Sequence, residues 1–118
     1  MTVDEPIERG LPRAYLRAVL LVLVAPGPTH GYELLEQVRE AGIRVADPGG
    51  LYRTLRAMDQ HGLFESWWEA SSSGPPRRTY ALTAAGREAL EAEIEAIRTT
   101  VDLLSDLVDR AERAVGPR

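Results

Sequence analysis

The sequence predicts a mostly α-helical protein with one small β-hairpin: three short helices, two strands and a long final helix. Apolar residues recur every three or four positions in several separate stretches, which is typical of amphipathic helices. An aromatic-rich, loosely alternating stretch between residues 63 and 82 is typical of two strands joined by a loop. A chain of 118 residues fits one domain with an appended helix.

The composition excludes several classes of site. The chain has no cysteine, which rules out disulfides, thiol nucleophiles and cysteine-ligated zinc. Its two histidines, His30 and His61, are far apart and have no ligand-spaced partner, so we expect no metal and no cofactor. The carboxylates are spread along helices, and no Ser–His pairing or phosphate-cradling glycine loop has sequence support. We therefore expect a protein that is not an enzyme.

The chain also lacks the usual signals for export or membrane insertion. Its N-terminus is acidic, whereas a signal peptide begins with a basic region. The most apolar run, residues 18–25, is eight residues long, and a transmembrane helix needs about 20. We expect a cytoplasmic protein without a membrane partner.

The net charge of −4 argues against nucleic-acid binding until its distribution is considered. Residues 1–10 carry a charge of −2, residues 11–82 carry +1 and residues 83–118 carry −3. Because local patches set the attraction to phosphate, the acidic ends leave residues 11–82 compatible with DNA.

Two helices are expected in the first third of the chain. The first covers about residues 11–25, is apolar almost all round, and ends at Pro26-Gly27-Pro28. A helix buried on several faces needs a second layer, which another subunit can supply. The second helix covers about residues 29–40, with Gly42 as its C′ stop. Its expected inner face comprises Leu34, Leu35 and Val38, with Tyr32 nearby.

A third helix, residues 47–60, is the centre of the prediction. Asp47 is an expected N-cap, and Pro48 suits the first helical position, where a missing N–H costs nothing. One side is an apolar stripe of Leu51, Leu55 and Met58. The opposite side carries Gly49, Arg53, Arg56 and Gln60. Arg and Gln side chains read base edges in a major groove, although many solvated helices also look like this.

The two strands are expected over residues 63–69 and 77–82, with a flexible loop over 71–76. Trp68 lies on the strand face of Phe64 and is expected in the core. Trp67 faces the other way. Two interpretations stay open for it: a ligand-stacking or interface residue, or an ordinary half-exposed strand aromatic.

The final helix is expected from Ala84 to about Ala114, with Thr83 as its N-cap. Its apolar residues are spaced alternately four and three apart, the pattern of a coiled-coil seam. The helix is about 45 Å long, longer than the domain before it, so part of the seam needs a partner. We expect a homodimer whose interface comprises Leu16, Leu20, Leu90, Ile94, Ile97, Val101, Leu104 and Val108.

This order of elements is the layout of a winged helix-turn-helix followed by a long C-terminal dimerisation helix. The expected organisation is a flexible N-terminal tail over residues 1–10, a winged helix-turn-helix domain over 11–82 and a dimerisation helix over 83–118.

Four motifs then indicate a family. They are PGPTHGYEL at residues 26–34, PGGLY at 48–52, GLFE at 62–65 and GPPRRTYALTAAG at 74–86. In this order and spacing they cover about residues 11 to 90, and the chain resembles the PadR-like family of bacterial winged-helix transcriptional regulators. Its short C-terminus resembles the subgroup with a single dimerisation helix.

The resemblance implies a dimeric DNA-binding regulator of repressor type. It also implies a response to a small effector, which in this family is often aromatic or amphipathic. Two positions depart from the family pattern. Gly50 stands where a small hydroxyl residue or alanine is usual, and Arg53 stands where many members have proline. The operator sequence therefore cannot be carried over.

The candidate DNA contacts are His30, Gly49, Gly50, Tyr52, Arg53, Arg56, Arg77 and Arg78. Arg53 and Arg56 are the expected base-reading residues, and at least one of Arg77 and Arg78 is expected to reach phosphate. His30 can contact phosphate or hold the turn. Tyr52 can bond phosphate or pack on the core edge, and the two glycines can admit phosphate or only shape the turn.

The sequence thus predicts a homodimeric transcriptional regulator that reads a palindromic DNA operator through its third helix and wing. A protein-interaction module that has lost DNA binding, and a dimer that only carries a small molecule, are the alternatives.

Overall fold

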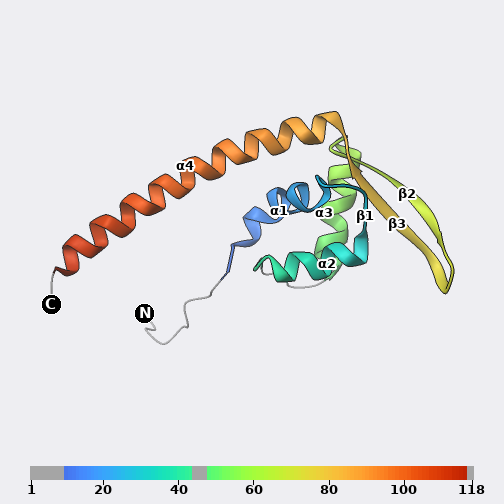
Figure 1. Cartoon of the computed structure of the whole chain (residues 1–118), viewed down its shortest axis with the longest axis horizontal. Helices are drawn as coiled ribbons and strands as arrows, with labels where there is room; N and C mark the ends of the chain where they lie inside the picture. Colours follow the sequence, from blue (N-terminus) through green and yellow to red (C-terminus); the bar gives the residue numbers. More distant parts are fainter. Residues whose placement is uncertain (1–9, 44–47, 117–118) are drawn as a thin grey trace.

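Helices and a three-stranded antiparallel sheet make up the part of the chain that the computed structural model describes, residues 10–43 and 48–116 (Figure 1). In chain order they are a 3-10 turn (Arg13–Tyr15), α1 (Leu16–Val24), β1 (Thr29–His30), α2 (Gly31–Glu40), α3 (Pro48–Gln60), β2 (Phe64–Ser71), β3 (Gly74–Leu82) and α4 (Ala84–Val115). The predicted mostly helical winged helix-turn-helix with a long final helix is confirmed. Asp47, the expected N-cap of α3, and most of the expected tail lie outside the described residues.

The core forms around α1, because this helix is apolar on nearly all sides. Leu20 and Val24 of α1 are completely buried, and side chains from α2, α3 and the sheet surround them. The surrounding residues include Leu34, Val38, Leu51, Leu55, Met58, Phe64 and Tyr80. Each such side chain contributes about 1.5–3 kcal/mol by leaving water, so these contacts fix the positions of α3 and the wing.

The sheet has one strand more than expected. Thr29 and His30 form β1 and pair with Tyr80 and Thr79 of β3, so the strand order is β1-β3-β2. The prediction that α2 begins near Thr29 or His30 is therefore wrong by one or two residues, since α2 begins at Gly31. A two-residue strand is too short for any alternation to reveal it, and only its partner in β3 makes it a strand.

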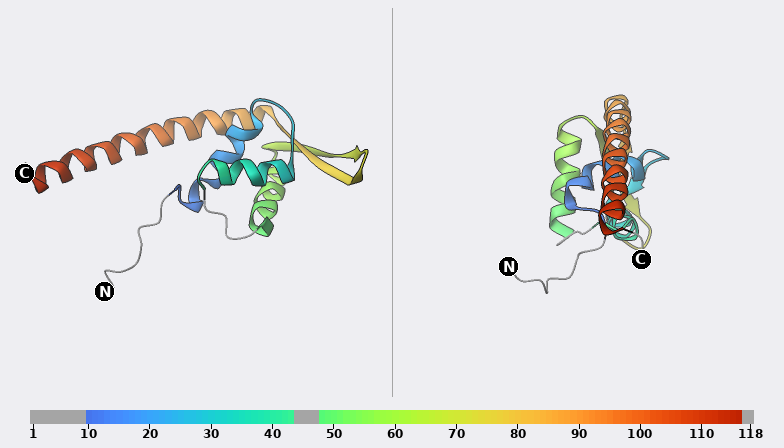
Figure 2. Two further views of the ribbon diagram at one scale, coloured as in Figure 1. Left: turned by 60° about the horizontal axis from the view of Figure 1, so that its bottom comes forward. Right: turned by 90° about the vertical axis from the view of Figure 1, so that its left-hand side faces the viewer.

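The expected loop over residues 71–76 is also wrong, because both strands of the hairpin continue into it and leave a turn only at Ser72 and Ser73. The pairing passes from Glu69↔Arg77 to Ser71↔Gly74 and thus skips Pro75 and Pro76. Proline lacks the N–H that a ladder requires, and an irregularity in pairing is a place where a strand tolerates it. The wing is consequently a long ribbon that extends beyond the helices (Figures 1 and 2).

The start of α1 differs as well. The expected helix over residues 11–25 is instead a 3-10 turn followed by α1 from Leu16. Pro12 is extended, with φ −59° and ψ 152°, and precedes the turn. Gly42 has φ +84° and ends α2 as predicted, since glycine adopts this conformation at little cost.

The junction between the sheet and α4 is tightly fixed. Thr83 caps α4 as predicted: its hydroxyl accepts the Gly86 N–H at 3.0 Å and lies 3.0 Å from the Leu63 carbonyl oxygen. A Cβ on Gly86 would lie 2.1 Å from that same carbonyl oxygen, so only glycine allows the first turn to sit this close to β2. The direction in which α4 leaves the domain is set here.

After its first turns α4 leaves the domain, which gives the molecule extents of 62 × 33 × 23 Å (Figure 2). Ala89 and Leu90 pack against the core, whereas residues 101–115 are all exposed. Among the described residues, no helix is long and apolar enough to cross a membrane.

Candidate nucleic-acid interface

Helix α3 has the two faces that its sequence predicts. Leu51, Leu55 and Met58 are at most 1% exposed and hold the helix on the core. Arg53 and Arg56 are exposed on the outer side, together with Gln60. Burial of the back thus fixes which donors the front presents to solvent.

The glycines and Tyr52 at the start of α3 have different surroundings. Gly50 is buried, and its carbonyl oxygen accepts the Thr54 hydroxyl at 2.9 Å. Gly50 therefore shapes the helix start and does not lie on the outer surface. Tyr52 is 40% exposed, and its ring flanks Gly31 at the edge of the core, which agrees with the packing role expected for it.

The two wing arginines point to opposite sides of the ribbon, as consecutive strand residues must. Arg78 faces α3. Its guanidinium donates to the Ser66 hydroxyl at 2.7 Å, lies 3.4 Å from the Asp59 carboxylate and stacks over the Trp68 ring at 5.3 Å. Ser66 also donates to Asp59. These contacts connect the wing to the end of α3.

Arg77 faces α2 instead. Its guanidinium donates to the Tyr32 hydroxyl at 3.0 Å and lies over the Tyr32 ring at 5.8 Å. Tyr32, expected nearer the core, is in fact 49% exposed, because the first turn of α2 lies beside the wing. Each wing arginine is therefore held by a different helix of the helix-turn-helix.

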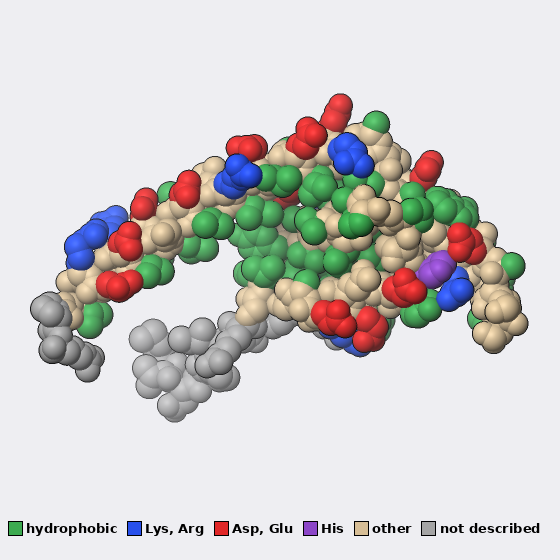
Figure 3. Space-filling view, in the orientation of Figure 1, with side chains coloured by type: hydrophobic (Ala, Val, Ile, Leu, Met, Phe, Trp, Pro, Cys, Tyr) green, Lys and Arg blue, Asp and Glu red, His purple; other side chains and the backbone are tan. Residues whose placement is uncertain are grey.

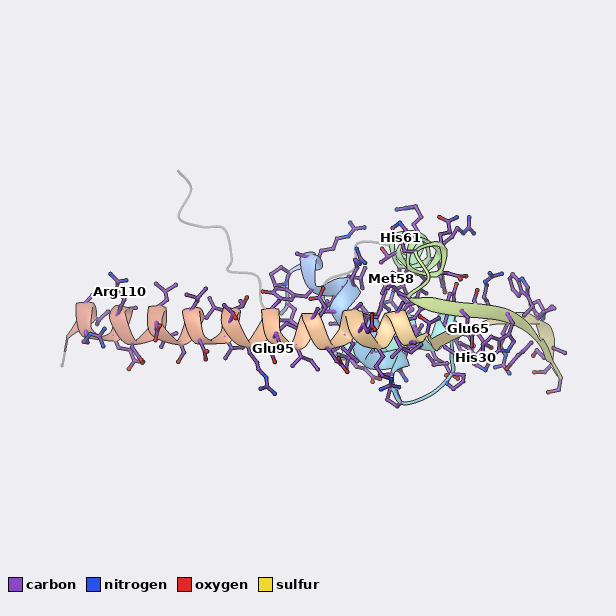
Figure 4. All side chains as sticks on the ribbon, turned by 90° about the horizontal axis from the view of Figure 1, so that it is seen from above. His30, Met58, His61, Glu65, Glu95 and Arg110 are labelled. Atoms are coloured by element: carbon purple, nitrogen blue, oxygen red, sulfur yellow. The ribbon has the colours of Figure 1, made fainter. Side chains whose placement is uncertain are left out.

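His30 lies within this same junction and does not point outward. Its Nδ1 is 3.0 Å from the Thr79 hydroxyl, its Nε2 is 3.9 Å from the Glu69 carboxylate, and its ring stacks on Tyr32. Of its two expected roles, these contacts favour holding the turn. Figure 4 places His30 and Glu65 beside the wing.

A cleft with a volume of about 620 Å³ lies between α3 and the wing. Its polar lining comprises Arg56, Gln60, Arg78 and the Asp59 carboxylate that pairs with Arg78, and Tyr52, Trp68 and Tyr80 add aromatic surface. Burial raises the pKa of the Tyr80 phenol above its ordinary value, and the nearby Arg78 charge opposes that rise. Tyr80 therefore keeps its proton at neutral pH. The surface offers hydrogen-bond donors and two guanidinium groups, which suits an anionic, base-bearing partner.

Comparison with known proteins gives the family. The model of the transcriptional regulator PadR-like family matches residues 19–92, which include most of α1, the helix-turn-helix, the wing and the start of α4. The chain belongs to the PadR-like family. It is a transcriptional regulator with a DNA-binding winged helix, and the family consists of regulators rather than enzymes.

Solved structures agree with this PadR-like assignment. A PadR family transcription regulator from Clostridium difficile R20291 is 26% identical, covers 80% of this chain and 98% of its own, and has a TM-score of 0.71. A PadR-like transcriptional regulator from Bacillus cereus is 27% identical over 81% and 93%, with a TM-score of 0.72. A protein of unknown function described as a potential transcriptional factor is 30% identical over 95% and 100%, with a TM-score of 0.77. No curated protein matches the chain.

The expectation that Trp68 belongs to the core of this PadR-like protein is wrong. Trp68 is 63% exposed, although Phe64 on the same strand face is buried. Strand alternation gives the face correctly, but the ribbon has passed the end of the core by Trp68. Trp67 lies on the other face and donates to Glu69 at 3.1 Å.

Two of the expected dimer residues require correction. Leu16 and Leu20 are 4% and 0% exposed, because α2, α3 and the sheet already cover them within the same chain. They have no surface left for a partner. Val22 is the large apolar side chain of α1 that is exposed, at 52%. On α4 the later part of the seam is uncovered, at Ile94, Val101, Leu104 and Val108, and so are Leu103 and Leu107, which the heptad pattern misses.

Sequence reasoning also missed residues that adjoin the recognition helix. Asp59 and Ser66 were not candidates, yet they hold Arg78. Arg13 and Arg17, at the start of the helical domain, border α3 on its other side. The sequence carried a weak signal for this second pair, because two arginines four residues apart lie on one side of a helix.

Proposed function

We propose that this PadR-like protein is a homodimeric repressor that binds a two-fold symmetric DNA operator. In this proposal α3 enters the major groove and the wing grips the backbone beside it. Arg53 and Arg56 read base edges, and Gly49 and Tyr52 approach the phosphates at the start of the helix. Arg77 and Arg78 supply the backbone contacts of the wing.

The observation that carries the proposal is the fixed relation between α3 and the wing. The apolar back of α3 is buried, and Arg78 is tied through Asp59 to the last turn of the same helix. A groove-reading surface must be held in place before it binds, because ordering it afterwards costs affinity. The contacts of Arg78 and Arg77 supply that order on both sides of the ribbon.

Support for the homodimer comes from α4. Its exposed residues include Val101, Leu104 and Val108 on the predicted seam, with Leu103 and Leu107 beside it. At about 100° per residue these side chains span roughly half of the helix circumference. Figure 3 shows hydrophobic side chains under α4 and on the domain surface facing it, while acidic side chains lie above the helix. Such a broad apolar face suits a partner that contributes more than one helix.

The site for the second copy is an apolar groove of about 610 Å³ between α1 and the middle of α4. Tyr15, Val19 and Val22 line one side, and Ile97, Val101 and Leu104 line the other. The distal half of α4 from a second copy has the matching apolar face. Two-fold pairing would then place two α3 helices on half-sites roughly 10 base pairs, or a multiple, apart.

Relief by a small effector is part of the same proposal. The groove is almost wholly apolar in its lining, so an amphipathic or aromatic molecule could enter between the two copies. Such a molecule would alter the angle between the subunits and with it the spacing of the two α3 helices. Trp67 lies on the wing and does not line this groove, so it is not part of the proposed effector site.

Selection of genomic DNA fragments by the purified protein tests the proposal. We expect enrichment of one sequence with two-fold symmetry, followed by a mobility shift at about 0.15 M salt with a stoichiometry of two chains per operator. Transcription from that operator in a reconstituted system should fall when the protein is added. Failure to enrich any fragment would contradict DNA binding and favour an interaction module or a ligand carrier.

A further inference from the structure

A cleft of about 440 Å³ lies on the side of α3 that faces away from the wing. The 3-10 turn and the start of α1 form one wall, and α3 forms the other. Arg13 and Arg17 project from the first wall, Arg53 and His61 from the second, and Met58 lies between them. No acidic residue is among the described residues that line it. Arg13 and Arg17 therefore give the first wall of the cleft a positive charge.

Arg13 and Arg17 are exposed and have no acidic partner among the residues that the structure describes. In the ranges 10–43 and 48–116, the ion pairs join His30 with Glu69, Arg39 with Glu36 and Arg78 with Asp59. Two like charges four residues apart destabilise a helix start slightly. An arrangement that costs stability and concentrates positive charge is suited to an anion from outside the chain.

The position of the cleft identifies that anion. Along α3, the residues on the wing side are Tyr52 and Asp59, whereas those lining the cleft include Ala57 and His61. At about 100° per residue these two sets lie on opposite flanks of the helix. Figure 4 shows the same arrangement from above: the start of α1 and the wing lie on opposite sides of α3, with Met58 and His61 labelled on that helix.

A helix in a major groove about 12 Å wide has a phosphate strand on each side. The wing serves one strand. We propose that Arg13 and Arg17 bind the phosphates of the other strand, so that α3 is clamped between two backbone contacts. This inference rests on the proposed DNA binding and extends it to a part of the chain outside the helix-turn-helix and the wing.

The test is the salt dependence of DNA binding by an Arg13→Gln/Arg17→Gln variant, measured by fluorescence anisotropy on the selected operator and on a random duplex. The slope of log K against log salt is negative, and each lost phosphate contact reduces its magnitude by about 0.9. The four arginines substituted in a dimer therefore reduce this magnitude by up to about 3.6. Affinity for both duplexes should fall by at least about tenfold at 0.1 M salt. The ratio between operator and random DNA should stay within about twofold, because phosphate contacts carry no sequence information.

An Arg98→Gln/Arg110→Gln variant is the matched control, since it removes the same charge from exposed positions on α4 that do not line the cleft. Its slope should equal that of the unmodified protein. Equal slopes for the unmodified protein and the Arg13/Arg17 variant would overturn the inference and leave the proposed function intact. Equal flattening in the control would also overturn it, because net charge alone would then explain the effect.

Calorimetry with inorganic phosphate separates DNA from a small anion as the source of the phosphate. We expect no measurable phosphate binding below about 1 mM, because one phosphate ion satisfies only part of an extended clamp. Phosphate binding that the Arg13/Arg17 variant loses, combined with unchanged DNA slopes, would make the cleft a small-anion site and overturn the inference. Absence of DNA binding by the unmodified protein would instead be a failure of the proposed function itself.

Discussion

The winged-helix domain and the distal half of α4 differ in how far their apolar side chains are buried. In the domain, the large apolar side chains on the inner faces of α1 and α3, such as Leu20 and Leu55, are fully covered by the same chain. In distal α4, Val101 and Leu104 are more than half exposed. Both regions have a regular apolar period in the sequence. The apolar period therefore marks an apolar face of the helix. It does not indicate whether another element of the same chain packs on that face.

This difference in burial suggests that the domain and the distal half of α4 have different structural roles. The domain orients α3 and the wing within one chain, since every contact that holds Arg78 comes from that chain. The distal helix sets the relation between two chains in the proposed dimer. Changes in the domain should then affect folding or DNA contact at any protein concentration. Changes in distal α4 should affect assembly and depend on concentration.

The largest effect is expected for Leu20→Ala, which leaves a cavity at a completely buried position. The free energy of unfolding should fall by about 2–5 kcal/mol, as measured by urea denaturation. The same loss should occur in a monomeric variant, because the residues around Leu20 are all in its own chain. A loss that disappears in the monomer would place Leu20 in the interface after all.

The next largest effect is expected for Val101→Glu combined with Leu104→Glu. Two carboxylates in an apolar interface lack partners there, so the dimer should dissociate at micromolar concentration in sedimentation experiments. Circular dichroism of the helical content should change little, since both side chains are exposed within one chain. Operator affinity should fall by about 100-fold through the loss of bivalent binding.

Asp102→Asn is the control for this pair, because Asp102 is an exposed charged residue between the two positions. It should remain dimeric. A Val101/Leu104 variant that still sediments as a dimer would contradict the role we give to distal α4.

Arg53→Ala and Arg56→Ala test the domain without touching assembly. Each should cost about 1–3 kcal/mol on the selected operator and much less on random DNA, because a base-edge contact is lost. The variants should still sediment as dimers. Operator binding that survives the double substitution unchanged would refute α3 as the reading helix.

The smallest effect is expected for Asp59→Asn, which weakens the contact between α3 and Arg78. Arg78 is then no longer shared between Asp59 and a phosphate, so binding to random DNA should strengthen and the salt slope should steepen by up to about 0.9 per released arginine. The ratio of the affinity for the operator to the affinity for random DNA should decrease. In the Arg78→Ala background, Asp59→Asn should no longer steepen the slope; an identical effect there would mean that Asp59 acts only through its own charge.

Most of the architecture followed from local patterns in the sequence. The stripe of Leu51, Leu55 and Met58 gave the orientation of α3, and Thr83 gave the start of α4. These patterns are local, because helical periodicity and capping depend on residues a few positions apart. Strand β1 could not be predicted this way, because Thr29 and His30 are a strand only through their pairing with β3.

The candidate site likewise has features that local sequence patterns predict and features that depend on tertiary contacts. The sequence by itself determined which residue types face outward on α3, and it gave the wing with its adjacent Arg77 and Arg78. Only the tertiary structure decided that Arg78 pairs with Asp59, that Trp68 lies beyond the core and that Leu20 is closed to a partner. The physical reason is that periodicity fixes the direction of a side chain relative to its own element. What that side chain then meets depends on where the elements end and which other elements lie opposite them.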